Sequence, residues 1–392
     1  MKYLITGATG FIGRWVARKL VEQGHDVRSI TRNPDRDRHM GETGVEVMRG
    51  DLTRKESMRE AMTGMDGVFH TAEWHRLGVK DKKEIAVAEA LNVTGTRNVM
   101  ELVRELKIPR CVYTSTLAVF SDTKGRKFNE TYRPHGPWSS IYDFTKWEAH
   151  YEIVQKMQEQ RVPIIIVQPG LVYGPGDASS MHNMWVAYLQ KRLKMVPKKT
   201  AFCWGHVEDI ATGHIQAMEK GKPGESYILA GPQHTLVEAF EIAQKITKVK
   251  PPRFHPDPIM MQSFAAVMGI VGHLKHVPEA SSAEALRTLA GKTYLGADQK
   301  ARLELDFLPR SLETGLRETL EFELAELKRL ALDSGTLHQT PDGIRQKMAN
   351  PITSLKSTLK DRNLKPQSEP QDLQARMKER DLKSKVKNPK TK

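Results

Sequence analysis

Residues 2–13 read KYLITGATGFIG, an apolar run that leads directly into three glycines spaced three apart. The run up to Thr6 predicts a β-strand, and Phe11 begins a helical pattern. Glycines at such a turn let the backbone approach a pyrophosphate closely, and the helix N-terminus offers N–H donors to it. This strand-turn-helix context predicts a dinucleotide site formed by Gly7, Thr9, Gly10, Phe11, Ile12 and Gly13.

Short β-branched runs alternate with long amphipathic segments through the first 337 residues. Such alternation is typical of βαβ units around a parallel sheet. The segment from Ile164 to Val167 is continuously apolar, which fits a strand covered on both faces. The sequence therefore predicts an α/β fold with a Rossmann-type doubly wound parallel sheet. Strands are expected at 2–6, 26–32, 45–49, 66–72, 110–116 and 163–168, and helices near 11–23, 54–63, 83–106 and 139–160.

The pattern changes after Pro169 to helix-rich sequence with isolated strands, and it closes with a charged helix around 311–331. We expect residues 1–170 to form a dinucleotide-binding domain whose core is completed by 200–231. A smaller, interleaved substrate-binding lobe is expected at 171–337. Residues 338–392 contain no Phe, Trp or Tyr, so they are predicted to be a disordered basic tail, with a nascent helix near 370–385.

Charge and cysteine content exclude several classes of protein. The tail has 14 Lys+Arg against 6 Asp+Glu, so it contributes most of the formal charge of +14. Its interspersed acidic residues and lack of aromatic rings argue against specific nucleic-acid binding and leave a solvated extension or a weak contact with an anionic surface. Cys111 and Cys203 have no metal-ligand or disulfide spacing. Without a signal peptide or a long apolar run, a cytoplasmic location is expected.

The end of the second expected strand bears on the choice of nicotinamide cofactor. It reads TRNP at residues 31–34, with Arg28 and Arg36 close by. An acidic side chain there would hydrogen-bond the ribose 2′-hydroxyl of NAD, whereas arginine accommodates the 2′-phosphate of NADP. Arg32 therefore favours NADP(H), with NAD as the alternative cofactor and a solvated arginine at a strand end as the plainer interpretation.

Tyr142 and Lys146 stand four residues apart in the expected helix 139–160, so both side chains can point into one cleft. A phenol with a pKa near 10 is a poor acid-base catalyst at neutral pH. A lysine ammonium about 4 Å away contributes about 4 kcal/mol at an effective dielectric of 20, or roughly three pKa units. The pair is therefore a candidate for acid-base catalysis.

With these features in place, the chain resembles the extended short-chain dehydrogenase/reductases over about residues 1–325. Further matching motifs are GDL at 50–52, HTA at 70–72, NVTGTRN at 92–98, PGLVYGPG at 169–176 and HVEDI at 206–210. The resemblance adds further cofactor contacts, namely Asp51, Leu52, Thr71, Ala72, Asn92, Pro169, Gly170 and Val172.

The same resemblance implies three catalytic residues. Tyr142 would protonate the carbonyl oxygen during reduction, or deprotonate the alcohol in reverse. Lys146 would bind the nicotinamide ribose and lower the pKa of the tyrosine. Thr116, at the end of a strand, would hydrogen-bond the substrate oxygen where charge develops. Tyr142 and Lys146 would thus also contact the cofactor, which supplies the hydride chemistry.

Departures from the family pattern separate its branches. Leu117 and Ala118 stand where sugar-nucleotide 4,6-dehydratases have an acidic pair, and Phe202 stands where sugar-nucleotide epimerases usually have an arginine for the substrate phosphate. The stretch HDVRSITRNP at 25–34 instead resembles dihydroflavonol-4-reductases and their bacterial relatives, a pattern close also to 3-beta-hydroxysteroid-dehydrogenase-like reductases. The expected activity is hydride transfer between NADP(H) and a ketone, aldehyde or alcohol on a largely apolar small molecule.

Two other functions remain open from the sequence. A sugar-nucleotide epimerase or dehydratase would retain NAD tightly through its cycle. A non-catalytic dinucleotide-binding scaffold would not need Thr116, Tyr142 and Lys146 together. A homodimer through the two long helices, which this family commonly pairs, is a further possibility.

The resemblance also places several residues near the substrate, either as contacts or as ordinary packing: Trp74, His75, Trp138, Tyr173 and Met181. The apolar segment 258–274 is expected to be a buried or lid helix over a hydrophobic pocket, with a membrane-surface contact as the alternative. His206 is expected to be structural, because the sequence offers it no partner at metal-ligand spacing.

Overall fold

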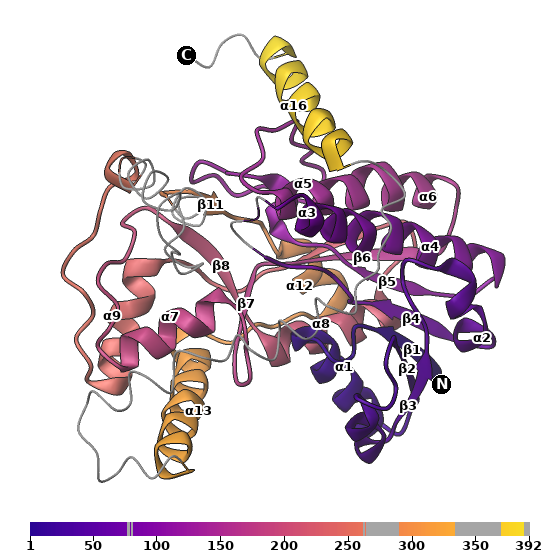
Figure 1. Ribbon diagram of the computed structural model, residues 1–392, viewed down its shortest axis with the longest axis horizontal. Helices are drawn as coiled ribbons and strands as arrows, with labels where there is room; N and C mark the ends of the chain where they lie inside the picture. Colours follow the sequence, from indigo (N-terminus) through magenta and orange to yellow (C-terminus); the bar gives the residue numbers. More distant parts are fainter. Residues whose placement is uncertain (77–78, 80, 262, 264–289, 334–369, 388–392) are drawn as a thin grey trace.

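The computed structural model describes residues 1–76, 79, 81–261, 263, 290–333 and 370–387 (Figure 1). Its central sheet consists of β1 (Lys2–Thr6), β2 (Asp26–Thr31), β3 (Val45–Arg49), β4 (Gly67–His70), β5 (Cys111–Thr114), β6 (Ile164–Pro169) and β9 (Ser226–Leu229). All pairings are parallel, in the order β3-β2-β1-β4-β5-β6-β9. The order reverses between β1 and β4, which confirms the doubly wound sheet and places a ligand crevice at that point.

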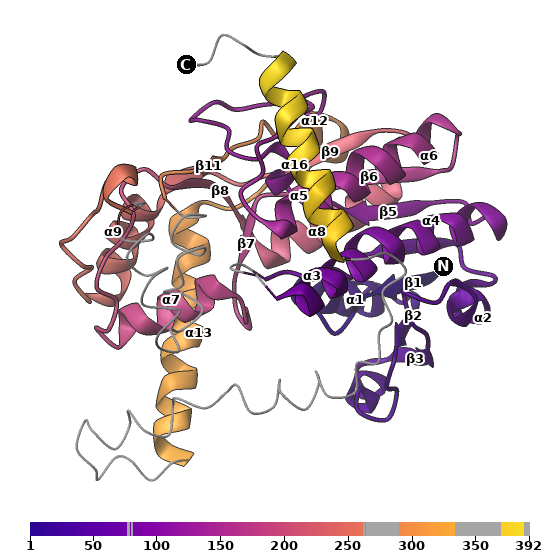
Figure 2. The ribbon, with the colours of Figure 1, turned by 45° about the horizontal axis from the view of Figure 1, so that its top comes forward.

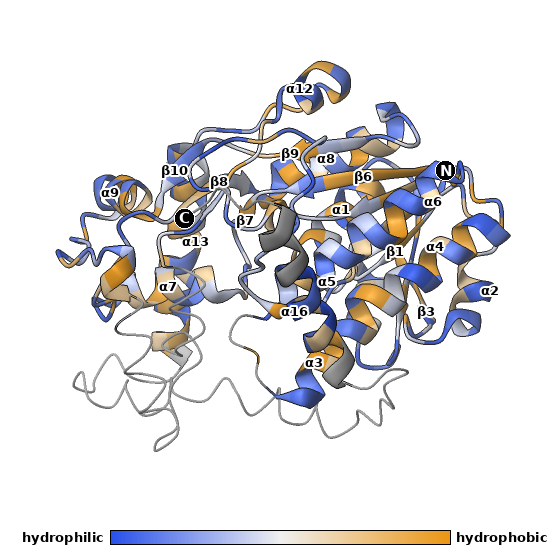
Figure 3. Ribbon diagram, turned by 90° about the horizontal axis from the view of Figure 1, so that it is seen from above, coloured by the Kyte–Doolittle hydropathy of each residue, from blue (hydrophilic) through white to orange (hydrophobic). Residues whose placement is uncertain are grey.

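The apolar run in β6 is covered on both faces, as its sequence predicts. Ile165 and Val167 pack into one buried core, whereas Ile164 and Ile166 pack into another on the opposite face of the sheet. Figure 3 shows β6 as one of the more hydrophobic strands of the molecule. Because successive side chains alternate across a strand, such a sequence is stable only between two layers of helices.

Helices cover both faces of the central sheet. One face is covered by α1 (Phe11–Glu22), α8 (Val207–Lys220) and α12 (Gln299–Leu305). The other face is covered by α2 (Arg59–Met62), which follows a 3₁₀ turn at Lys55–Met58, and by the two long helical segments described next.

Each of the two expected long helices contains a π-helical turn. The first comprises α3 (Lys82–Glu89), the π turn η3 (Ala90–Gly95) and α4 (Thr96–Glu105). The second comprises α5 (Ile141–Trp147), the π turn η5 (Glu148–Val154) and α6 (Gln155–Glu159). π turns inside α-helices are frequent at functional sites, and both segments contain residues expected at the site.

A second, smaller sheet lies beside the first. Its strands are β7 (Leu171–Tyr173), β8 (Ala201–His206), β10 (Gln233–Thr235) and β11 (Thr293–Tyr294). It packs with α7 (Ser180–Leu189), α9 (Leu236–Thr247) and α13 (Leu312–Asp333) around a separate apolar core. Residues 200–231 were expected to complete the core of the first domain. Within this range, α8 and β9 do join that core, whereas β8 belongs to the smaller sheet. Most of the apolar segment 258–274 lies outside the described residues.

The C-terminal helix α16 (Pro370–Lys387) lies against α3 and α5, although these two helices come much earlier in the sequence (Figures 1 and 2). Leu373 is fully buried in the core cluster that also contains Trp147, and Arg376 forms ion pairs with Glu89 and Glu148. The helix expected near 370–385 is confirmed. A solvated extension is wrong for this part of the tail, because Leu373 and Met377 pack on an apolar core and Arg376 pairs with two carboxylates.

Among the residues that the structure describes, no helix combines the length and the apolar character needed to cross a bilayer.

Candidate active site

The glycine turn between β1 and α1 has a shape that side chains would prevent. Gly7 has a φ of +78°, and a Cβ there would lie 2.6 Å from the Cα of Ala72. A Cβ on Gly13 would lie 2.2 Å from the carbonyl oxygen of Gly7. No side chain caps the N-terminus of α1, so its N–H donors face the cavity described next. The turn therefore fits a pyrophosphate group.

A cavity of about 640 Å³ lies at the carboxyl ends of the central strands. Most residues expected from the sequence line it: Gly7, Thr9, Gly10, Phe11, Ile12, Gly13, Arg32, Asp51, Leu52, Thr71, Ala72, Thr116, Tyr142, Pro169, Gly170 and Val172. Asn92 and Lys146 lie just behind this lining and are buried. The structure thus gathers residues from the whole of 7–172 into one crevice.

The end of β2 supplies positive charge to one end of the cavity. Arg32 and Arg36 both line it, and Arg32 is exposed. Arg36 forms an ion pair with Asp37 at 3.0 Å. Arg28 points elsewhere, because its guanidinium pairs with Glu46 at 2.8 Å and donates to a backbone carbonyl of α2. Of the three arginines considered, Arg32 is therefore the best placed to meet an anion.

Tyr142 and Lys146 share one face of α5, which begins at the N-cap Ser140. The ammonium of Lys146 donates to the carbonyl oxygen of Thr114 at 2.8 Å and pairs with the carboxylate of Glu73 at 3.0 Å. The Tyr142 hydroxyl donates to both carboxylate oxygens of Glu73, each at 3.2 Å. Glu73 thus joins the two side chains, and nothing in its sequence position had indicated this.

Charges around Tyr142 oppose the expected activation of its hydroxyl. Burial raises its pKa well above the ordinary value of 10, and the Glu73 carboxylate raises this pKa further, while the Thr116 hydroxyl acts in the opposite direction. Burial alone would lower the pKa of Lys146, yet Tyr113 and Glu73 raise it on balance. Glu73 thus adds a negative charge beside the Lys146 ammonium, and the lowering of the tyrosine pKa by Lys146 stays a prediction.

Asn92 is a structural support of the site rather than part of the cavity wall. Its side-chain oxygen accepts from the backbone N–H of Trp74 at 2.7 Å, and its amide donates to the Trp74 carbonyl and to the Thr145 hydroxyl, both at 3.0 Å. It therefore ties the loop that contains Glu73 to α5.

The other end of the cavity is mainly apolar and aromatic. Phe202 and Tyr294 stack with ring centroids 5.9 Å apart and an interplanar angle of 6°. The Tyr294 hydroxyl donates to Asp143 at 3.3 Å. Burial raises the pKa of Asp143 to about 6. The apolar and aromatic part of the lining consists of Leu91, Leu117, Met181, Met184, Phe202 and Tyr294. The polar residues Asp177, Ser179 and Ser180 also line the cavity, and His75 lies near Tyr142.

Three of the aromatic residues expected near the substrate do not line the cavity. Trp138 packs edge to face against Phe144 and Trp147, at centroid distances of 5.0 and 5.1 Å. Tyr173, at the end of β7, is buried in the core of the smaller sheet, and Trp74 is partly buried against the core cluster that contains Trp138. Packing thus explains these three, whereas His75 and Met181 do line the cavity.

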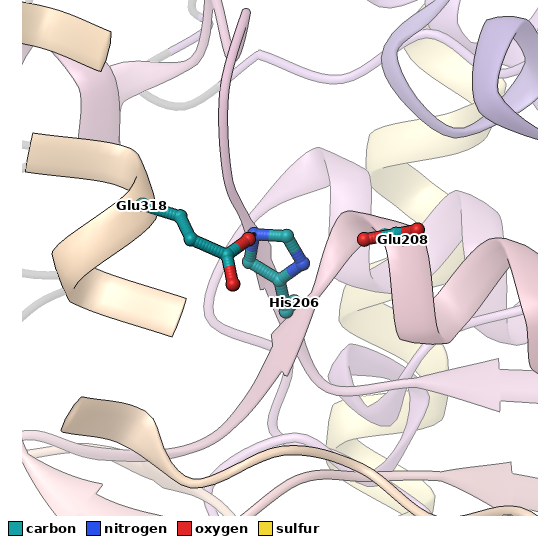
Figure 4. Close-up of side chains that lie close together, drawn as sticks. All are labelled: His206, Glu208 and Glu318. Carbon is teal, nitrogen blue, oxygen red and sulfur yellow. Dashed lines mark ion pairs between the residues drawn. The ribbon is translucent and has the colours of Figure 1, made fainter. Parts of the chain in front are cut away.

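His206, Glu208 and Glu318 bring one potential metal-ligand atom each within 4.8 Å of one another (Figure 4). The sequence did not indicate this grouping, because Glu318 comes from α13. The guanidinium of Arg310 contacts Glu208 at 2.8 Å and Glu318 at 2.6 Å, and it also pairs with Asp209. Arg310 thus supplies the positive charge at this cluster, which joins α8 to α13 and supports a structural role for His206.

The sequence of this chain matches a known protein family. Residues 3–230 match the model of the NAD dependent epimerase/dehydratase family. A putative dihydroflavonol 4-reductase from Synechocystis is 28% identical over 64% of this chain and 74% of its own length. Cinnamoyl-CoA reductase 1 from Petunia hybrida is 32% identical over 58% of this chain and 71% of its own length.

Solved structures show the same fold. The crystal structure of gox2253 is 30% identical and superposes with a TM-score of 0.70 over 83% of this chain and 98% of that protein. The UDP-glucuronic acid 4-epimerase of Bacillus cereus, solved with NAD, is 18% identical with a TM-score of 0.66 over 83% of this chain and 99% of its own.

Proposed function

The chain belongs to the NAD dependent epimerase/dehydratase family, and on this basis we propose that it is an NADP(H)-dependent oxidoreductase. Its reaction is reduction of a ketone or aldehyde, or oxidation of the alcohol, on a largely apolar small molecule. The supporting observation is a single cavity with Arg32 at one end, Thr116 and Tyr142 in its wall, and an apolar and aromatic surface at the other end.

The lining of the cavity supports a carbonyl substrate over a sugar nucleotide. Among the described residues that line it, the only arginines are Arg32 and Arg36, both at the end of β2, and none is a lysine. The stacked pair Phe202 and Tyr294 occupies the part where the epimerase pattern expects an arginine. A nucleotide diphosphate would need a cation there, whereas an apolar substrate gains from contact with the rings.

Each polar residue has a role in this proposal. The glycine turn fits the pyrophosphate of the dinucleotide, and Arg32 would meet the 2′-phosphate. A bound nicotinamide supplies the hydride for the carbonyl carbon. Tyr142 would transfer its proton to the carbonyl oxygen, and the Thr116 hydroxyl would stabilise the charge that develops there. Solvent would then return a proton to Tyr142.

Purified protein incubated with NADPH and either an aryl aldehyde or an alkyl ketone tests this function. We expect NADPH consumption, and we expect Tyr142→Phe to reduce kcat by about 10²- to 10⁴-fold. Tyr132→Phe is the matched control, because Tyr132 stacks on Phe128 outside the cavity lining. Purification with tightly held NAD and interconversion of a UDP-sugar without NADPH consumption would instead identify an epimerase.

A further inference from the structure

Glu73 contacts both members of the catalytic pair. It accepts from the Tyr142 hydroxyl at 3.2 Å through each oxygen and lies 3.0 Å from the Lys146 ammonium. Its side chain is 26% exposed and lines the cavity, while that of Lys146 is 3% exposed. The carboxylate therefore lies between the buried lysine and the space in which a substrate would react.

The position of Glu73 is determined by its neighbours on both sides. Before it, the backbone N–H of Ala72 donates to the Thr6 hydroxyl at 3.3 Å. After it, the backbone N–H and carbonyl of Trp74 both bond to Asn92. A short loop held at both ends presents the carboxylate to α5, so this contact is part of the folded structure.

We propose that Glu73 is a positioning residue that holds the Tyr142 hydroxyl protonated and oriented as a proton donor. The inference rests on the proposed function. A carboxylate facing a phenol favours the protonated phenol, and its pairing with the ammonium removes the influence through which lysine would stabilise a phenolate.

The other groups around Tyr142 leave Glu73 as the main adjustable charge. Asp143 on the same helix raises the pKa of Tyr142, and the Thr116 hydroxyl lowers it. From the loop after β4, the ring of His75 lies edge-on with its centroid 4.5 Å from that of Tyr142. Among these groups, Glu73 has the largest effect on the tyrosine pKa after burial.

Ultraviolet titration of the phenolate in the free protein tests the proposal without any turnover. The signal of Tyr142 is the difference between a protein and its Tyr142→Phe version, measured once with Glu73 and once with Glu73→Gln. We expect the Tyr142 midpoint to fall by about 1–3 pH units in Glu73→Gln. Glu60→Gln is the control, because Glu60 is exposed on α2 and does not line the cavity.

An unchanged midpoint in Glu73→Gln would overturn the proposal. If circular dichroism shows that Glu73→Gln does not fold, Glu73→Asp is the second variant, because it retains the negative charge but moves it away from the Tyr142 hydroxyl. We expect a smaller fall in the Tyr142 midpoint for Glu73→Asp. No fall in this variant would also overturn the proposal. Because the titration needs neither cofactor nor substrate, its result is independent of whether the enzyme proves to be a reductase. If reduction is observed, Glu73→Gln should also move the alkaline limb of kcat to lower pH.

Discussion

At the scale of single residues, Arg32 is the side chain on which the proposed preference for NADP(H) rests. Its guanidinium is exposed at the cavity lining, and a hydrogen bond to a charged group contributes roughly 1.5–3 kcal/mol. We therefore expect Arg32→Ala to weaken NADPH binding by about 10- to 100-fold and to change NADH binding little. Fluorescence titration with both cofactors measures this.

Arg28→Ala is the matched control for that titration. Arg28 also lies on β2, but it pairs with Glu46 and does not line the cavity, so its loss should leave the NADPH affinity unchanged. A wild-type protein that binds NADH more tightly than NADPH would contradict the role assigned to Arg32 and favour the epimerase-like alternative.

Residue spacing predicted one property of Tyr142 and Lys146 and missed another. The four-residue spacing of Tyr142 and Lys146 correctly placed both on one face of α5. It could not reveal Glu73, which lies 69 residues before Tyr142 in sequence and reaches it only through the pairing of β4 with β5. The spacing of the pair therefore did not predict the negative charge that Glu73 places beside both side chains.

At the scale of elements, the π turn η3 supports the loop that contains Glu73. Asn92 lies in it, and the extra residue in the turn changes which side chains face inward from the helix. Asn92→Ala would leave the buried N–H and carbonyl of Trp74 without their present partner. We expect a loss of about 2 kcal/mol in the free energy of unfolding, measured with urea.

A surface asparagine provides the comparison for this variant. Asn183 is exposed on α7, and Asn183→Ala should change the free energy of unfolding by less than about 0.5 kcal/mol. Equal stability of Asn92→Ala and Asn183→Ala would show that the bonds to Trp74 contribute nothing.

At the scale of the whole molecule, α16 covers the outer side of the helices that form the site. Leu373 is buried in the core cluster that includes apolar side chains of α3 and α5, and Arg376 pairs with the carboxylates of Glu89 and Glu148. The homodimer expected through these helices therefore requires α16 to move away. We expect the full chain to be monomeric and a deletion of 370–392 to self-associate through the uncovered apolar surface.

Sedimentation equilibrium of the two chains measures this difference. Deletion of 388–392 alone keeps α16, so this shorter deletion should leave the protein monomeric. A monomeric deletion variant, or a dimeric full chain, would contradict the role of α16 as a cover.

Four buried histidines connect the stability of the molecule to pH. Burial lowers the pKa of His70 and His150 to about 3 and of His206 and His214 to about 4. The unfolded chain binds these protons at a pKa near 6.5, so their contribution is complete above about pH 6.5 and is lost as the pH falls toward about 4. Each histidine then costs about 1.4 kcal/mol per pH unit.

Urea unfolding near neutral pH and at about pH 5 measures this loss, which we expect to be about 2 kcal/mol for each histidine. His150→Gln should reduce the difference between the two pH values. His39→Gln should not, because His39 is exposed. An unchanged difference between the two pH values in His150→Gln would contradict the assignment, because buried acids such as Asp143 act in the opposite direction in both proteins.

The sequence by itself determined where the strands and helices of the central sheet lie along the chain, the glycine turn and many of the residues that line the cavity. These features depend on local pattern: alternation of apolar runs, glycines that a Cβ would block, and residues at the carboxyl ends of parallel strands, which always meet at one edge. Even the helix at 370–387 was indicated by local composition.

Only the tertiary structure decided which side chains meet across long separations. It brought Glu73 to Tyr142 and Lys146. It also placed Arg310 between Glu208 and Glu318, and it placed α16 against α3 and α5. It also removed Trp138 and Tyr173 from the cavity wall. Contacts of this kind depend on the angles and distances between packed elements, and a pKa depends on every charge and on the burial around it, so neither follows from spacing along the chain.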